Sequence, residues 1–127
     1  MTRKTIYSGT KFEELAGYCR AIVDGRWVIV SGTSGHNAKT GAISDDVQEQ
    51  TRESLRTIEA ALKEAGSGLE DIVRVRVFVA ERDYVMPVSA VLKEIFDKIR
   101  PTNTTIVSVL ADESMKVELE VTALRTE

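Results

Sequence analysis

Near its end the chain reads Arg100-Pro101-Thr102-Asn103-Thr104-Thr105-Ile106-Val107-Ser108-Val109-Leu110, and soon afterwards Lys116-Val117-Glu118-Leu119-Glu120-Val121. The first segment is rich in threonine and β-branched residues, which favour strands. In the second, apolar residues alternate with glutamates, which is the period of a strand with one buried side. The two segments therefore predict two short strands.

A helix and a further strand are predicted just before them. Asp83 starts a helical pattern that Pro101 ends, because the residue before a proline is pushed out of the helical region. Pro87 must lie in the first turn of this helix or just outside it. The apolar face of the helix consists of Val88, Val91, Leu92, Ile95, Phe96 and Ile99. The preceding strand alternates Val73, Val75, Val77 and Val79 with Arg74, Arg76 and Phe78.

A longer helix is predicted in the middle of the chain. Ser44 and Asp45 are its candidate caps, with Gln48 at capping-box spacing from Asp45, and Gly66 stops it. Its apolar stripe recurs at steps of three and four and consists of Val47, Thr51, Leu55, Ile58, Leu62 and Ala65. One face of this helix therefore packs against a core.

The first part of the chain predicts strands. Asp24-Gly25 separates the apolar runs 19–23 and 27–31, which is a strong hairpin signal. Ile6 and Tyr7 lie in a plausible first strand, and the polar stretch 11–17 is too short for a helix to be predicted. The order is three strands, helix, strand, helix and two strands. This order predicts an α+β sandwich with both helices on one face of a mostly β sheet.

Composition limits the organisation and the partners of the protein. The chain has 127 residues, of which 43% are hydrophobic, so we expect one domain spanning residues 1–127. A net charge of -3 gives no general attraction to nucleic acid or to an anionic membrane, and no segment has the length of an apolar membrane helix. A single cysteine excludes an intrachain disulfide and fits a cytoplasmic protein. Small molecules and other proteins are the expected partners.

Many short features share their order and spacing with proteins of the Rid (reactive intermediate deaminase, YjgF-like) family. They are Gly17-Tyr18, Val30-Ser31-Gly32, Lys39-Thr40-Gly41, Glu64-Ala65-Gly66, Asp71-Ile72-Val73, Val77-Phe78-Val79, Pro101 and Val117-Glu118-Leu119-Glu120. The chain resembles this family from about Tyr18 to its end. Some members carry the name endoribonuclease L-PSP, but the basic, aromatic-rich surface signature of an RNA-binding protein is missing here.

The resemblance implies a chorismate-mutase-like fold with a mixed sheet, assembled as a homotrimer that binds ligands in clefts between subunits. It also implies hydrolysis of reactive enamines and imines to keto acids and ammonia, with no cofactor and no metal. By the same resemblance, Tyr18 corresponds to a tyrosine near the cleft, Ser31 and Gly32 to the strand end lining it, and Glu118 to the carboxylate that positions water.

Three positions depart from the family pattern. Asn103 occupies the position of an arginine that grips the substrate carboxylate, Thr105 stands where a cysteine is common, and Val88 aligns with a cleft asparagine. An amide has no permanent charge and no two-pronged donor fork, so a carboxylate-bearing substrate would lose a charge-assisted contact. Asn103, Thr104 and Thr105 could instead form a neutral polar pocket for an amide, hydroxyl or carbonyl. The alternative is that they are ordinary turn and strand residues.

The remaining candidates also have two interpretations. Glu118 is either the group that orients and deprotonates water or an exposed carboxylate on the outer face of a strand. Tyr18 is either a catalytic proton donor or an amphipathic interface residue. Cys19 is interpreted as a small buried residue, and His36, the only histidine, as an exposed loop residue. Trp27 and Phe78 are interpreted as core or trimer-interface residues.

These observations lead to one main hypothesis. The protein is a Rid-like trimer that binds a small carbonyl, imine or enamine metabolite in its intersubunit clefts, with a hydrolytic or deaminating activity of altered specificity. Its predicted catalytic residues are Glu118 and Tyr18, and its predicted substrate-binding residues are Ser31, Gly32, Asn103, Thr104 and Thr105. The alternatives are a non-catalytic metabolite-binding or regulatory trimer and, third, a ribonuclease.

Overall fold

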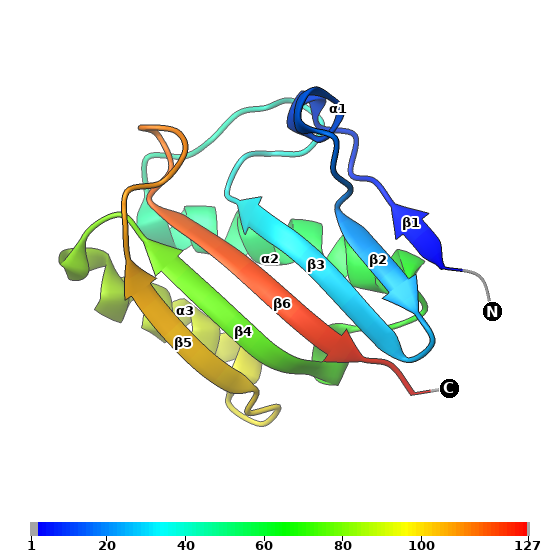
Figure 1. Cartoon of the computed structure of the whole chain (residues 1–127). Coiled ribbons are helices and arrows are strands. Elements are labelled where there is room, and N and C mark those ends of the chain that lie inside the picture. The colour runs from blue at the N-terminus through cyan, green and yellow to red at the C-terminus, as the bar shows by residue number, and fades with distance from the viewer. Residues whose placement is uncertain (1–2, 127) are drawn as a thin grey trace.

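The computed structural model describes residues 3–126, in which a six-stranded sheet carries two long helices on one face (Figure 1). The strands are β1 (Lys4–Ile6), β2 (Ala21–Asp24), β3 (Trp27–Ser34), β4 (Ile72–Val79), β5 (Thr102–Val107) and β6 (Val117–Leu124). The helices are α1 (Lys11–Ala16), α2 (Val47–Glu64) and α3 (Val85–Phe96), with short 3₁₀ turns η1 (Leu69–Asp71) and η2 (Arg82–Tyr84). The predicted α+β architecture is confirmed.

The strand order across the sheet is β1-β2-β3-β6-β4-β5. β4 and β5 pair in parallel, because α3 carries the chain back between them, and the other neighbouring pairs are antiparallel. The sheet is therefore mixed, as predicted. The last strand, β6, lies between β3 and β4, so residues from both halves of the chain meet at its sides.

The core lies between the sheet and the two long helices. Valines alternate along β3, β4 and β6, and the side chains that point toward the helices are buried. The core residues of the central strands are Val28, Val30, Val75, Val77, Val79, Val117, Leu119 and Val121, and those of the helices are Leu55, Ile58, Ala61, Leu62, Val88, Val91, Leu92 and Phe96. Glu118 and Glu120 alternate with these β6 residues, so they lie on the opposite, open face of the sheet.

One predicted helix boundary and one unpredicted helix require correction. The cap of α2 is Asp46 rather than Ser44 or Asp45, because its carboxylate accepts a hydrogen bond from the Glu49 amide at 3.2 Å. The segment predicted to be too short for a helix forms α1. Thr10 caps its start, and Gly17 ends it in the left-handed region at φ 72°.

The open face of the sheet exposes large apolar side chains. Trp27 and Ile29 on β3 are each 52% exposed, and Val73 on β4 is also exposed. Trp27 is therefore not part of the core of this chain. Arg76 and Glu120 form an ion pair at 2.6 Å on the same face. Within residues 3–126, no helix is long and apolar enough to cross a membrane.

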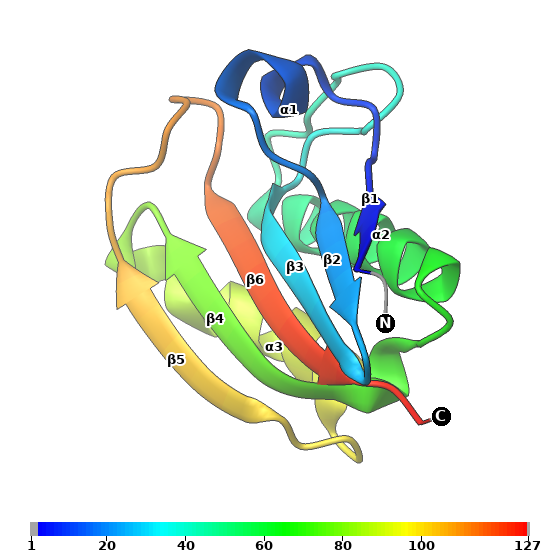
Figure 2. The same ribbon diagram turned by 45° about the vertical axis from the view of Figure 1, so that its right-hand side comes forward.

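Three segments outside the sheet lie together at one of its ends. α1, the loop after β3 and the loop before β6 all lie beyond the C-terminal end of β3 (Figure 2). They come from sequence positions far apart, and they surround the point where β3 and β6 meet. The candidate site lies at this end.

Candidate functional site

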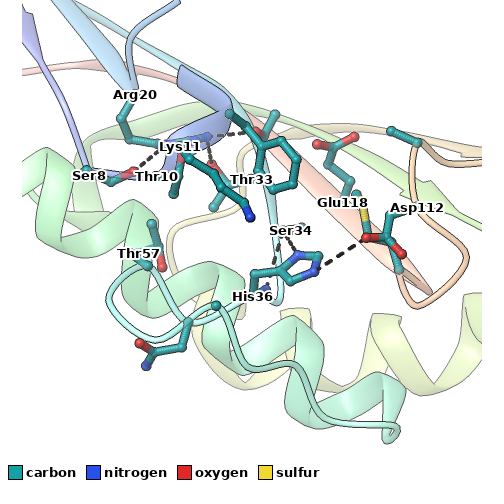
Figure 3. A pocket seen from close by; sticks show the side chains of 18 of the residues that line it. Ser8, Thr10, Lys11, Arg20, Thr33, Ser34, His36, Thr57, Asp112 and Glu118 are labelled. Carbon is teal, nitrogen blue, oxygen red and sulfur yellow. Dashed lines mark hydrogen bonds and ion pairs between the residues drawn. The ribbon is translucent and has the colours of Figure 1, made fainter. Parts of the chain in front are cut away.

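A pocket of about 870 Å³ opens at this end of the sheet. Its walls come from α1 and the segments on either side of it, from the end of β3 and the loop after it, and from the loop before β6 and the start of β6 (Figure 3). The chemically relevant side chains that line it are Lys11, Tyr18, Arg20, Ser34, His36, Asp112 and Glu118. The pocket thus combines acidic and basic groups in one concave site.

Glu118 lies half-buried on β6, opposite Ser34 of β3 and Phe78 of β4. Burial raises the pKa of its carboxyl above the ordinary value, while the Arg20 charge lowers it and the Glu120 charge raises it. A carboxyl with a raised pKa is a stronger base once ionised, which suits proton abstraction from water. Glu118 is therefore not the exposed carboxylate of the alternative interpretation.

Gly32 makes room for this carboxylate. A Cβ atom on residue 32 would come within 2.9 Å of Glu118 Oε2, so any side chain there would displace the carboxylate. The pairing of β3 with β6 shifts register between Val30 and Thr33, which is a bulge at the pocket. Gly32 and Glu118 therefore lie next to each other in the wall of the pocket.

Arg20 and Glu13 form a buried ion pair beneath the pocket. Each residue is 4% exposed, and Arg20 Nη2 lies 3.2 Å from Glu13 Oε2. The guanidinium also donates to the Gly32 carbonyl oxygen at 2.7 Å and to Thr33 Oγ1 at 3.1 Å. Burial alone would raise the pKa of Glu13, but hydrogen bonds from Ser8 and Thr10 and the Arg20 charge hold it below the ordinary value. This cluster ties α1 to β2 and β3.

Tyr18 and Ser31, two predicted site residues, have different surroundings. Tyr18 lines the pocket, with its ring centroid 5.7 Å from the Arg20 guanidinium carbon. Ser31 is not among the residues that line the pocket, because its hydroxyl donates to the Cys19 carbonyl oxygen at 2.7 Å. Tyr18, Gly32 and Glu118 therefore line one pocket, and Ser31 does not line it.

Asn103, Thr104 and Thr105 lie on the edge strand β5, away from this pocket. Asn103 pairs with the buried Val75 and lines a separate groove of about 280 Å³ beside α3, and its Oδ1 accepts from Thr105 Oγ1 at 2.9 Å. Asn103 thus faces the helix side of the sheet, whereas Glu118 faces the open side. Within one chain, Asn103 and Glu118 do not share a site.

His36 is a pocket residue that the sequence interpretation placed in an exposed loop. Its ring is half-buried, with Nδ1 2.8 Å from Ser34 Oγ and Nε2 3.8 Å from Asp112 Oδ2 (Figure 3). Its sequence position could have identified it as a pocket residue, because it lies two residues beyond a strand that ends at the cleft. Among residues 3–126, no group of three His, Cys, Asp or Glu side chains is arranged to hold a metal ion.

Comparison with known proteins gives consistent matches over nearly the whole chain. The model of the endoribonuclease L-PSP family matches residues 9–125. The 2-iminobutanoate/2-iminopropanoate deaminase of Salmonella typhimurium is 30% identical over 125 residues, which cover 96% of this chain and 98% of that protein.

Solved structures agree with this match. The crystal structure of Rv2704 from Mycobacterium tuberculosis, a member of the YjgF/YER057c/UK114 family, has a TM-score of 0.87 at 37% identity and covers 97% of this chain and 99% of that one. Escherichia coli TdcF, solved with bound serine, has a TM-score of 0.80 at 29% identity and covers 86% and 88%. The chain therefore belongs to the endoribonuclease L-PSP, or Rid/YjgF, family.

Proposed function

We propose that the protein binds a small carbonyl, imine or enamine metabolite in the pocket around Glu118 and hydrolyses the carbon–nitrogen bond of the imine or enamine. The observation that carries this proposal is the half-buried Glu118 carboxyl, whose pKa is raised by burial and which faces Gly32 inside a concave site. Two relatives support a small nitrogen-containing ligand: the 2-iminobutanoate/2-iminopropanoate deaminase of Salmonella typhimurium and Escherichia coli TdcF, which was solved with bound serine.

The proposed reaction uses water and side chains of the protein. Ionised Glu118 takes a proton from a water molecule as the water oxygen attacks the imine carbon, and the imine nitrogen takes a proton from solvent, which gives a carbinolamine. The carbinolamine nitrogen then gains a second proton, its hydroxyl loses a proton to solvent as the carbonyl forms, and the carbon–nitrogen bond breaks to release ammonia. Tyr18 is assigned to the wall that contacts the ligand. We place this reaction in the cytoplasm, in a single domain of 127 residues.

We further propose that a second copy of the chain completes each site. All six residues of β5 are exposed, including Ile106 and Val107, and an uncovered edge strand with apolar side chains is a surface that proteins normally cover. A neighbouring copy would bring its Asn103 and Thr105 to the Glu118 pocket and so form a cleft between subunits. Thr104 alternates with these two residues and would face the subunit interface.

We propose that the copies assemble as the homotrimer that the family resemblance implies, which light scattering can measure. The wild-type protein should scatter as three chains, and Ile29→Asp should scatter as one folded chain, because it places a charge on the open apolar face. Ala60→Asp, at an exposed position of α2 on the far side of the core, is the matched control and should remain trimeric. A monomeric wild-type protein would remove the intersubunit cleft from the proposal.

A non-catalytic metabolite-binding trimer is the second candidate, and the neutral Asn103 favours it. A charge-assisted bond to a carboxylate contributes about 1.5 to 3 kcal/mol against about 1 for a neutral hydrogen bond, so ligands that bear a carboxylate would bind weakly. A regulatory protein can function while binding carboxylate-bearing ligands weakly, whereas an enzyme that hydrolyses the imines of keto acids must bind a carboxylate. The two candidates differ in whether bound ligand is turned over.

The test follows hydrolysis of 2-iminobutanoate, generated in place by an amino-acid oxidase, by the rate of 2-oxobutanoate formation. The wild-type protein should exceed the buffer rate, and Asn103→Arg should lower KM for this carboxylate substrate by about tenfold, as the difference between the two contacts implies. If neither protein exceeds the buffer rate and Glu118→Ala leaves binding of 2-oxobutanoate unchanged, the enzyme proposal fails and the metabolite-binding alternative replaces it.

A further inference from the structure

Three polar side chains form a connected row along one wall of the Glu118 pocket. Ser34 Oγ and His36 Nδ1 are joined by a hydrogen bond of 2.8 Å, and His36 Nε2 lies 3.8 Å from Asp112 Oδ2. Figure 3 shows the three side chains in sequence, with Glu118 on the same side of the pocket. The hydrolysis proposed above uses Glu118 but none of the three residues of this row.

The sheet register places this row next to Glu118. Ser34 and Glu118 are direct partners in the antiparallel pairing of β3 with β6. Side chains directly opposite one another in such a pair have Cβ atoms about 4.5–5.5 Å apart. A small ligand in the pocket can therefore touch the Glu118 carboxylate and the Ser34 hydroxyl together.

Gly35 fixes the turn that brings His36 to this wall. A Cβ atom at residue 35 would lie 2.6 Å from the Gln50 Cα of α2, so only glycine allows the loop to pack this closely against the helix. The Gln50 amide group in turn donates to the Ser44 and Ser114 carbonyl oxygens, at 2.7 and 2.9 Å. The two loops that carry His36 and Asp112 are thus held to the same buried side chain.

The two ring nitrogens of His36 have different partners. A proton on the ring can therefore pass from Nδ1 toward Ser34 and the pocket. Nε2 lies near the Asp112 carboxylate, and Nδ1 faces the Ser34 hydroxyl. A protonated Nδ1 can donate to Ser34 Oγ while the Ser34 hydroxyl proton passes on into the pocket. Phe12 packs near the ring at 6.4 Å between centroids. Other charged groups on the pocket wall are Lys11, Arg20 and Lys39.

We propose that Ser34 and His36 form a proton relay that protonates the departing nitrogen, while Glu118 removes the proton from water. This proposal rests on the hydrolysis described above and adds its acid group. The nitrogen receives the Ser34 hydroxyl proton as the carbon–nitrogen bond breaks, and Ser34 Oγ is reprotonated by His36. The carbinolamine hydroxyl proton passes to solvent as the carbonyl forms, ammonia leaves, and His36 and Glu118 return to their starting states by proton exchange with solvent.

Single-residue variants in the 2-iminobutanoate assay test the relay. General acid catalysis contributes about 10²–10⁴ to a rate, so His36→Ala and Ser34→Ala should each lower kcat by at least about tenfold with KM within about twofold. Ser34→Thr keeps a hydroxyl and should retain most of kcat. Added imidazole should raise kcat of His36→Ala with saturation, but it should not raise kcat of Ser34→Ala. Lys98→Gln, exposed and outside both pockets, is the control and should match wild type.

The outcomes separate the relay from the proposed function. If the wild-type protein hydrolyses the imine in a Glu118-dependent way but His36→Ala retains its full kcat, the relay is wrong and the function stands. A rise in KM at unchanged kcat would also overturn the relay, because it would show a binding role. If neither the wild-type protein nor Asn103→Arg hydrolyses the imine, the relay fails together with the proposed hydrolysis. Far-UV circular dichroism and thermal unfolding of each variant identify a loss of fold.

Discussion

Glu118→Gln should lower kcat for imine hydrolysis by about hundredfold or more, the range expected when a general base is removed. The amide keeps the shape of the side chain but cannot accept a proton from water. Glu120→Gln is the matched control, since Glu120 lies on the same strand and face and an amide can still accept a hydrogen bond from Arg76. Equal kcat values for Glu118→Gln and wild type would remove Glu118 from the reaction.

The pKa of Glu118 gives this prediction a pH dependence. Activity requires the ionised carboxylate, so wild-type kcat should fall as pH decreases through the raised pKa, above the ordinary value of 4.5. Stability should change in the opposite direction. A carboxyl whose pKa is higher in the folded state stabilises the fold below its unfolded pKa, and this contribution is lost as pH rises through the folded pKa.

Glu118→Gln should therefore lose activity without losing stability. As pH rises from 4.5 through the raised pKa of Glu118, wild type loses stability that the amide variant, which has no charge to bury, keeps. Thermal unfolding at several pH values measures this difference. A Glu118→Gln variant that is clearly less stable than wild type at neutral pH would show that the carboxylate has structural partners.

Arg20→Met should destabilise the fold by about 3–5 kcal/mol, because it leaves the buried Glu13 carboxylate without its positive partner. The loss should be visible in urea unfolding at a fixed protein concentration. Glu13→Gln combined with Arg20→Met should recover much of the loss, since no buried charge remains.

Arg56→Met is the matched surface control for this prediction. Arg56 also pairs with two glutamates, at 3.0 and 2.6 Å, but its side chain is exposed, and exposed pairs contribute about 0–1 kcal/mol. If Arg20→Met costs no more than Arg56→Met, the buried cluster does not hold α1 against the sheet. The pocket wall would then depend on other contacts.

Much of the fold was predictable because its elements repeat a simple period. The alternating valines of β4 and the apolar stripes of α2 and α3 each identify one buried face, and two such helices need one sheet face to cover them. α1 was not predictable in this way. Its six residues carry no full period, and it depends on the Thr10 cap and the left-handed Gly17.

The site was only partly predictable from the sequence. The family resemblance assigned Glu118, Gly32 and Tyr18 to one cleft, and all three line the same pocket. The separation of Asn103 from Glu118 depends on which sheet face each strand position occupies, and that requires the β4–β5 and β3–β6 registers. The burial of His36 depends on a loop from much later in the chain that brings Asp112 to it.

A crystal structure of the protein grown with 2-oxobutanoate, the product of the assay substrate, is the most direct test of the central claim. We expect the molecule in the pocket, with its carbonyl oxygen within about 3.2 Å of a Glu118 carboxyl oxygen or of one bridging water. Asn103 of a neighbouring copy should contact the same molecule. Density for the ligand at another site, or an empty Glu118 pocket with no neighbouring β5, would contradict the account.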